Sequence, residues 1–187
     1  MSNFKFSSPE LRLVLAAFAL APSVYFLWPA KKQDSTEHVK TFNKLIQSCP
    51  TLRPEALVAS ATRDFAHTIL PASFKIPARQ VAAFRDHAET IFSLFESFEM
   101  TPQPNKERNP VHLSLETNTV TAHCKMGGKE SELGQKLIAS GLTEWWTECV
   151  LLVQMNPNGK RIIEVREFVH SAKAEELQQR LSGVLSN

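Results

Sequence analysis

The 187-residue sequence predicts an α+β domain in which three helices are followed by about four antiparallel strands. Two observations lead to this prediction. Apolar residues recur at spacings of three and four up to about residue 98, as in amphipathic helices, and they alternate with polar residues beyond it, as in strands. A curved sheet of this kind wraps the long helix and leaves an opening, which is where small ligands bind.

Composition excludes several classes of function. The formal net charge of +2 is close to zero, and no Lys/Arg stripe or zinc-finger spacing is present, so we expect no nucleic-acid partner. The three cysteines are odd in number and far apart, which argues against a disulfide framework. Because the cysteines and histidines also lack metal-ligand spacing, we expect no metal site.

Residues 12–29 are almost uninterrupted apolar sequence, followed by Lys31 and Lys32. At about 1.5 Å per residue, a helix of this length spans roughly 27 Å, close to the thickness of a bilayer core. A membrane anchor is the first interpretation, a cleaved signal peptide the second and a buried N-terminal helix the third. In the first interpretation, residues 1–32 form a hydrophobic segment and residues 33–187 form the folded domain. The segment anchors the domain to a membrane, on its cytosolic side. A cytoplasmic chain is the alternative.

The helical half begins with a capping box formed by Asp34 and Glu37, and its first helix stops before Pro50. A second helix is predicted from about residue 53 to 65. The longest helix follows Pro77, and its apolar residues share one face. These residues are Val81, Phe84, Ala88, Ile91, Phe95 and Phe98.

The second half contains the strands. Residues 98–103 start a strand, and residues 111–116 and 120–125 form a hairpin around 117–119. Residues 127–141 are predicted to be a loop with a helical turn. A helix over residues 172–185 closes the chain.

The strongest hairpin signal lies in residues 143–169, with the turn Asn156-Pro-Asn-Gly159 at its centre. Alternation places Ile163, Val165, Glu167 and Val169 on one face of the second strand. Burial in an apolar row would raise the pKa of Glu167, which makes it a candidate catalytic group. Two alternatives stay open: Glu167 lies at a solvated strand end, or the opposite face is the buried one.

Three short motifs resemble those of fungal SnoaL-like proteins in the nuclear transport factor 2-like cone superfamily. The first is an Arg, a His four residues later and Leu-Pro-Ala-Ser, matched by Arg63, His67 and residues 70–73. The second is an aromatic strand motif at residues 145–149. The third is Glu-Phe-Val with a following Ser, matched at residues 167–171. Where that family has two tyrosines and an Asp, this sequence has Trp145, Cys149 and His170.

The resemblance implies a cone-shaped pocket, often within a homodimer, and cofactor-independent chemistry on polyketide, terpenoid or alkaloid intermediates. It implies that Arg63 and Glu167 line the pocket as polar catalytic groups. Isomerisation, dehydration and cyclisation are the reactions to be expected.

Chemical reasoning assigns roles to the same residues. Glu167 is the candidate base, and Arg63 or His67 would polarise a carbonyl group of the substrate. The substrate would contact Trp145, Thr147, Cys149 and Val165. Arg63 could instead form a salt bridge at a helix end, His67 could be a hydrogen-bonded core histidine, and Cys149 a small apolar core residue.

The sequence therefore predicts a membrane-tethered, homodimeric isomerase, dehydratase or cyclase that acts on a hydrophobic intermediate of fungal secondary metabolism. The alternative is a cone-fold protein that binds a hydrophobic small molecule, or forms a dimer, without catalysis.

Overall fold

A computed structural model describes residues 36–104, 110–142 and 147–185, which belong to one compact unit, Asp34–Asn187. The predicted membrane segment, residues 12–29, and the predicted boundary after residue 32 lie outside the described residues. Within the described ranges, no helix has the length and apolar character needed to cross a membrane.

The chain enters this unit through three short helical elements, α2 (Thr36–Ser48), η1 (Cys49–Thr51) and α3 (Pro54–Val58). The first helix ends where Pro50 was expected to end it, because a residue before proline avoids helical backbone angles. Phe42 and Leu45 of α2 are buried against the sheet.

The predicted second helix is wrong beyond Val58, because Ala61–Leu70 forms strand β1. This stretch is rich in β-branched and aromatic residues, and Phe65 and His67 alternate into the core as strand residues do. Strand β1 pairs in parallel with β6, so the sheet is mixed, not antiparallel throughout as predicted.

The long apolar stripe is divided between a helix and a strand. Helix α4 (Val81–Phe92) supplies the first part, and strand β2 (Phe95–Pro102) begins three residues after it. Phe95 and Phe98 are both buried although they are three residues apart, because a register shift between Phe95 and Ser97 moves the strand by one position. A bulged strand thus imitated helical spacing.

The remaining strands are β3 (His112–Ser114), β4 (Thr119–Glu130), β5 (Thr147–Met155) and β6 (Ile162–Val169). Helix α5 (Glu132–Ala139) replaces most of the predicted loop and is capped by the Ser131 side chain, which accepts from the Gly134 amide. Helix α6 (Ser171–Leu185) closes the chain, as predicted.

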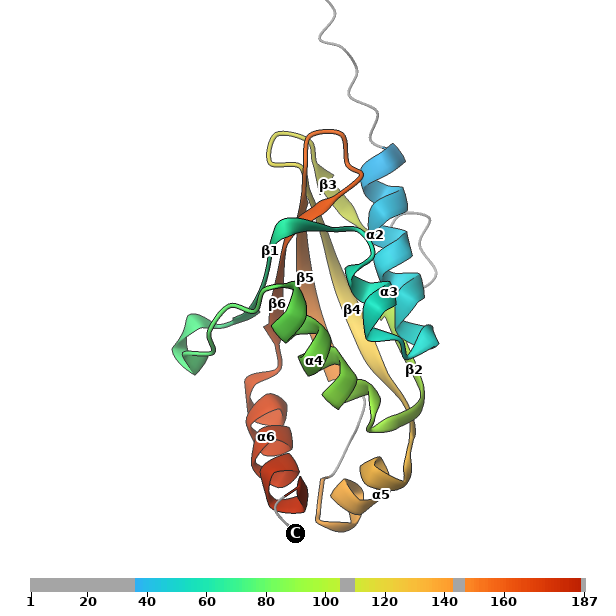
Figure 1. Ribbon diagram of the computed structural model, residues 1–187, viewed down its shortest axis with the longest axis vertical. Coiled ribbons are helices and arrows are strands. Elements are labelled where there is room, and N and C mark those ends of the chain that lie inside the picture. Colours follow the sequence, from blue (N-terminus) through green and yellow to red (C-terminus); the bar gives the residue numbers. More distant parts are fainter. Residues whose placement is uncertain (1–35, 105–109, 143–146, 186–187) are drawn as a thin grey trace, which may run out of the picture. The chain divides into compact units, whose positions relative to one another are not determined.

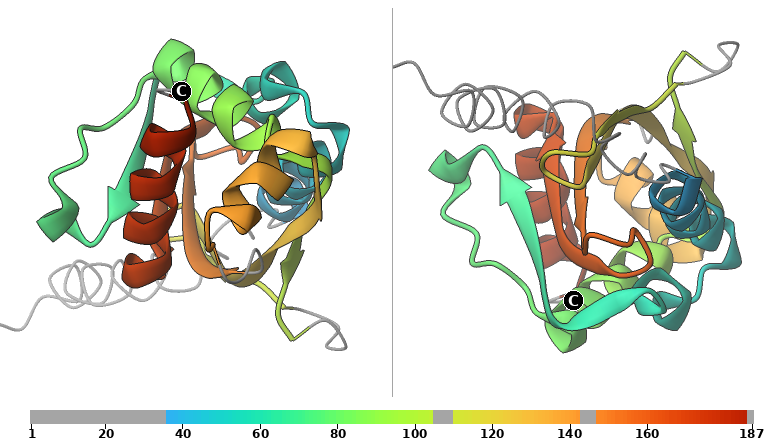
Figure 2. Two further views of the ribbon diagram at one scale, coloured as in Figure 1. Left: turned by 90° about the horizontal axis from the view of Figure 1, so that it is seen from below. Right: turned by 90° about the horizontal axis from the view of Figure 1, so that it is seen from above.

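The described strands form one curved sheet in the order β1-β6-β5-β4-β2, with β3 paired to β4. Helices α2, α3 and α4 lie across its concave face, and α5 and α6 lie toward one end (Figures 1 and 2). One apolar core joins α2 to the inner face of β1, β4, β5 and β6. A second joins α4 and α5 to β2, and Leu177 and Leu181 of α6 pack against it.

The β5–β6 hairpin has the predicted turn, in which Gly159 takes a φ of +70°. The predicted alternation on β6 holds for Val165 but not for the start of the strand. A register shift between Gln154 and Met155 turns Ile162 into the core, where it is 1% exposed, and leaves Ile163 only half-buried.

Candidate functional site

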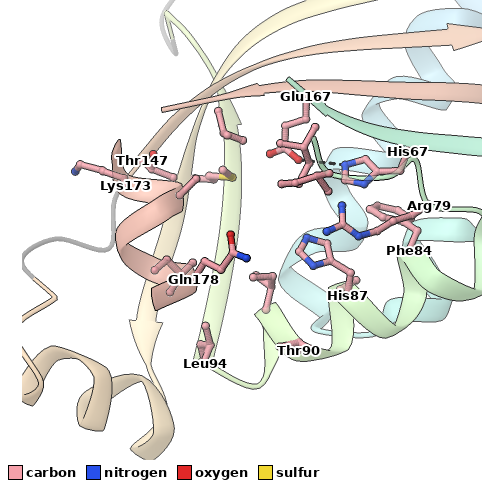
Figure 3. A pocket seen from close by; sticks show the side chains of 18 of the residues that line it. His67, Arg79, Phe84, His87, Thr90, Leu94, Thr147, Glu167, Lys173 and Gln178 are labelled. Carbon is pink, nitrogen blue, oxygen red and sulfur yellow. Dashed lines mark hydrogen bonds and ion pairs between the residues drawn. The ribbon is translucent and has the colours of Figure 1, made fainter. Parts of the chain in front are cut away.

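A cavity of about 690 Å³ lies between α4, α6 and the inner face of the sheet (Figure 3). Apolar side chains from α4, β2, β5 and α6 make up much of its wall. Polar side chains also line it, and several come from α6: Lys173, Glu175, Glu176 and Gln178. The others include His67, Arg79, His87, Thr90, Thr147 and Glu167.

Glu167 and His67 form a hydrogen-bonded pair in this wall. The distance between His67 Nε2 and Glu167 Oε2 is 3.3 Å, and the two side chains are 1% and 15% exposed, respectively. They meet because β1 and β6 are neighbouring parallel strands in which His67 lies opposite Val165, two residues before Glu167. The acid therefore faces the cavity, as predicted from the alternation of β6.

The pKa of Glu167 is lowered, whereas the sequence predicted a raised pKa. Burial alone would raise it, but the hydrogen bond and electrostatic effect of His67, with smaller contributions from His87 and from a hydrogen bond with Cys149, outweigh burial. The prediction was wrong in direction because these partners come from β1, α4 and β5. At neutral pH the carboxyl group is an ionised acceptor.

Arg79 is held beside His67 by the backbone. The His67 amide donates to the Arg79 carbonyl and the Arg79 amide donates to the His67 carbonyl, both at 2.8 Å. Figure 3 shows the guanidinium group between His67 and His87, directed into the cavity. Its Nη1 is buried without a hydrogen-bond partner in the described structure. Burial lowers the pKa of Arg79, and the charge of Glu167 acts in the opposite direction.

His87 comes from α4, and its ring stacks on that of His67 with a centroid distance of 6.1 Å. Burial, followed by the charges of Arg79 and His67, lowers the pKa of His87 to about 4, so the ring is neutral at pH 7. Phe84, also on α4, lies 4.4 Å from the His67 ring between centroids. The two aromatic rings of α4 thus fix the orientation of His67.

Two buried cysteines, Cys149 and Cys49, lie near the Glu167 carboxyl group. Cys149 is 2% exposed and is the cross-strand partner of Cys124. A hydrogen bond to Cys124, burial and the charge of Glu167 raise the pKa of Cys149, which keeps it a thiol. Cys49 lines the cavity, and burial raises its pKa to about 12. Both groups are therefore poor nucleophiles.

The other predicted site residues separate into three groups. Val165 and Thr147 line the cavity, as predicted. Cys149 does not line the cavity, but it forms a hydrogen bond with Glu167. Trp145 lies outside the described residues.

Arg63 does not face Glu167 across the cavity, contrary to the sequence prediction. It is exposed and is not among the cavity-lining residues. A register shift in β1 accompanies this position: residues 61 and 66 pair with residues 162 and 164, so the regular alternation of the strand does not extend across Arg63. The guanidinium group of the site belongs to Arg79 instead.

Arg79 and His87 were missed from the sequence. His87 carries a weak signal, because it is a polar residue between Phe84 and Ile91 on the apolar face of a helix. Arg79 carries none, since its position depends on a backbone bridge formed by a non-helical segment.

The arrangement combines an ionised carboxylate, a guanidinium group and two imidazole rings, of which that of His87 is neutral, around a largely apolar space. Such a site can remove a proton from a bound molecule and stabilise negative charge elsewhere on it. Among the residues that the structure describes, no cluster of three or more His, Cys, Asp or Glu side chains is suited to hold a metal ion.

No family model and no curated protein matches this sequence. Its fold, however, is similar to that of solved structures. BvnE pinacolase from Penicillium brevicompactum superposes with a TM-score of 0.67 at 14% identity, covering 82% of this chain and 95% of that one. PrhC from Penicillium brasilianum superposes with a TM-score of 0.64 at 11% identity, covering 79% of this chain and 89% of that one.

A protein from Jannaschia sp. CCS1 described as a SnoaL-like polyketide cyclase gives a TM-score of 0.56 at 14% identity, covering 75% of this chain and 90% of that chain. The curved sheet, the helices on its concave face and these similarities agree on one architecture. The chain has the cone fold that nuclear transport factor 2-like and SnoaL-like proteins share.

Proposed function

We propose that this protein is a cofactor-independent acid/base catalyst that isomerises, dehydrates or cyclises a hydrophobic small molecule, with Glu167 as the base. The observation that supports this most directly is the Glu167–His67 hydrogen bond, 3.3 Å long, in the wall of an apolar cavity of about 690 Å³. A base must be ionised before it can accept a proton, and the lowered pKa of Glu167 meets this requirement at neutral pH.

His67 has a supporting role in this proposal. Its Nε2–H group donates to Oε2 of the carboxylate and so orients the group in the cavity wall. A positioned base of this kind accelerates proton transfer by roughly 10²- to 10⁴-fold.

We propose as the substrate an intermediate of fungal secondary metabolism, a polyketide, terpenoid or alkaloid, which is the class that the resemblance of the sequence motifs implies. The name of the BvnE pinacolase designates a catalyst, and that fold matches most of this chain. We propose in addition that residues 12–29 tether the protein to a membrane, where lipophilic intermediates are concentrated, and that the domain forms a homodimer.

The test begins with deletion of the coding sequence in its host and identification of the metabolite that accumulates. The purified full chain is then incubated with this metabolite, and product is followed by mass spectrometry. We expect Glu167→Gln, which keeps the shape but removes the base, to lower kcat by about 10²-fold or more. Arg63→Met is the control, since Arg63 is exposed and outside the cavity. Equal turnover by wild type and Glu167→Gln would refute the proposed base.

A specific observation supports the alternative of binding without catalysis. The chain contains a single tyrosine, Tyr25, which lies in the N-terminal segment, and Trp145 and Cys149 occupy the two tyrosine positions of the strand motif. No phenol from these positions can therefore act as an acid. If the wild-type chain binds the accumulated metabolite and releases it unchanged, the protein is a carrier.

A further inference from the structure

Helix α6 separates the cavity from solvent. Most of its residues between 173 and 181 line the cavity, and Figure 3 shows the side-chain amide of Gln178 directed into it. Yet Gln178 and Glu175, which also lines the cavity, are exposed to solvent. A helix whose residues face both spaces forms the wall between them, and a ligand can enter through this wall if the helix moves.

Apolar packing holds α6 only weakly. Leu177 and Leu181 pack against the second core, but both stay half-buried. Helix α4, on the other side of the cavity in Figure 3, fully buries Ala88 and Phe92. An element that buries little apolar surface opens locally at a lower free energy than the core does. Of these two walls, α6 is therefore the one that moves more easily.

Helix α5 is the element that α6 contacts most, and its C-terminal end presents an acceptor. This end is a Schellman motif, in which the Gly141 amide donates to the Ile138 carbonyl at 2.8 Å. The Leu142 amide donates to the Leu137 carbonyl at 3.2 Å. The Ser140 carbonyl takes no part in the motif, and the C-terminal end of a helix attracts positive charge. A cationic side chain can therefore bind there.

Arg180 of α6 supplies that side chain. Its Nη1 donates to the Ser140 carbonyl, and its Nε donates to Glu176 Oε1, one helical turn earlier, at 3.2 Å. Gly141 makes the approach possible, because its φ is +103° and a Cβ atom added there would lie 3.0 Å from Arg180 Nη1 and 3.2 Å from Nη2. Residues of both helices thus build this contact, which distinguishes it from the chance pairing of a flexible surface side chain.

We propose that α6 is a lid on the cavity and that Arg180 is its latch. When the guanidinium group releases the Ser140 carbonyl, α6 swings about its junction with β6 at His170 and opens the wall that carries Gln178. A ligand then enters or leaves, and the renewed hydrogen bond closes the cavity. This inference concerns access to the cavity and does not depend on the base assigned to Glu167.

The latch governs rates more than affinity. It is present in the closed form with and without a ligand, so its loss destabilises both states alike and cancels in the dissociation constant. Entry and exit both pass through the open form. When the latch is lost, the open form becomes more populated and both rate constants rise together.

The probe is Nile red, a neutral apolar dye whose fluorescence rises in apolar surroundings. Its association and dissociation rate constants are measured by stopped-flow mixing with the purified full chain. We expect Arg180→Met to raise both by about fivefold or more and to change Kd by less than about twofold. Arg180→Lys can still donate to the Ser140 carbonyl and should give intermediate rates. Arg85→Met is the matched control and should keep the wild-type rates, because Arg85 is exposed on α4 and does not line the cavity.

Hydrogen exchange locates the motion in the chain. In the free wild-type protein, the amides of α6 should exchange faster than those of α2 and β5. Nile red should slow exchange in α6 and α4, since both helices line the cavity. Arg180→Met should speed exchange in α6 and leave α2 and β5 unchanged, whereas a merely structural role of Arg180 predicts faster exchange in all of them.

Gly141→Ala disturbs the same contact from the side of α5, because the added Cβ atom would meet the guanidinium group. It should raise the exit rate of the dye, as Arg180→Met does. The double variant should exceed the faster single variant only slightly, since two changes that act on one contact are not additive.

The lid is refuted if Arg180→Met has the dye rate constants of Arg85→Met, if it weakens Kd in proportion to the exit rate, or if the wild-type chain binds no Nile red. The proposed base is tested separately, because Glu167→Gln should exchange the dye at wild-type rates. Loss of turnover in Glu167→Gln, with dye rates independent of Arg180, would retain the base and refute the lid. The reverse pattern would retain the lid and refute the base.

Discussion

Two hydrogen-bond donors hold the Glu167 carboxylate from opposite directions. His67 donates from the neighbouring strand, and the Cys149 thiol contacts the carboxylate from β5. Cys149 is buried and does not line the cavity, so it contacts the base without reaching the substrate. It is therefore a positioning residue, and its effect should be visible in the ionisation of Glu167.

We predict that Cys149→Ala raises the pKa of Glu167, because a donor to the charged form is lost while burial continues to favour the neutral form. The active base is the ionised form, so the acid limb of the kcat/KM profile should move to higher pH. A thiol is a weak donor, and we expect a shift of about half a pH unit. The measurement is kcat/KM for the pathway metabolite as a function of pH.

Cys149→Ser and Cys124→Ala are the matched controls. Serine keeps a donor at position 149, so the acid limb should return toward the wild-type value. Cys124 is equally buried and contacts Cys149, but no hydrogen bond from it to Glu167 influences that carboxylate. An acid limb that stays in place in Cys149→Ala would show that the thiol has no influence on the base.

At the scale of single residues, the sequence indicated on which face of its strand Glu167 lies, but not which side chains contact it. Alternation on β6 correctly turned Glu167 toward the cavity. The pKa of Glu167 depends on His67, which is 100 positions earlier in the chain. No periodicity within one strand contains such a contact, which is why the direction of the shift could not be predicted.

At the scale of elements, register shifts explain most differences between the expected and the observed structure. Strands β1, β2 and β6 each contain or adjoin one. A bulge changes the two-residue period of a strand and can imitate the spacing of a helix, as Phe95 and Phe98 do. A register shift also accompanies the position of Arg63 outside the site, and another brings Ile162 into the core.

The hairpin turn is the element that was predicted best, and it also supports a test. Gly159 has a φ of +70°, and a Cβ atom added there would lie 2.5 Å from His38 Nδ1 and 2.6 Å from the His38 backbone nitrogen. We predict that Gly159→Ala lowers the free energy of unfolding by more than the ~1–2 kcal/mol that a left-handed conformation alone costs an L-residue. The urea midpoint measures this change.

In the same assay, we expect Gly183→Ala to raise the free energy of unfolding. Gly183 lies in α6, and a Cβ atom there would meet nothing within 4 Å. Alanine is the better helix former, so the free energy of unfolding should rise by roughly 0.5–1 kcal/mol. If Gly159→Ala were as stable as wild type, the backbone of the turn would have to differ from the one described.

At the scale of the whole molecule, the chain divides into a unit of residues 1–33 and a unit of residues 34–187. The fold and the candidate site belong to the second unit. The α+β class followed from hydrophobic periodicity, whereas the position of β1 between α3 and α4 and its parallel pairing with β6 did not. Parallel pairing joins residues about 100 positions apart, and local sequence patterns carry no information about it.

If residues 12–29 anchor the protein in a membrane, the wild-type chain should remain in the membrane fraction of its host after an alkaline carbonate wash. Two charges in the middle of that segment, Ala17→Arg with Leu20→Arg, should release it, since each arginine at the centre of a spanning helix costs about 2.5–3.5 kcal/mol. Ala82→Arg with Ala83→Arg adds the same charge to two exposed positions of α4 and should leave the protein in the membrane fraction. A wild-type chain that carbonate extracts completely would rule out the anchor, and the lipophilic substrate would then have to reach the cavity from solution.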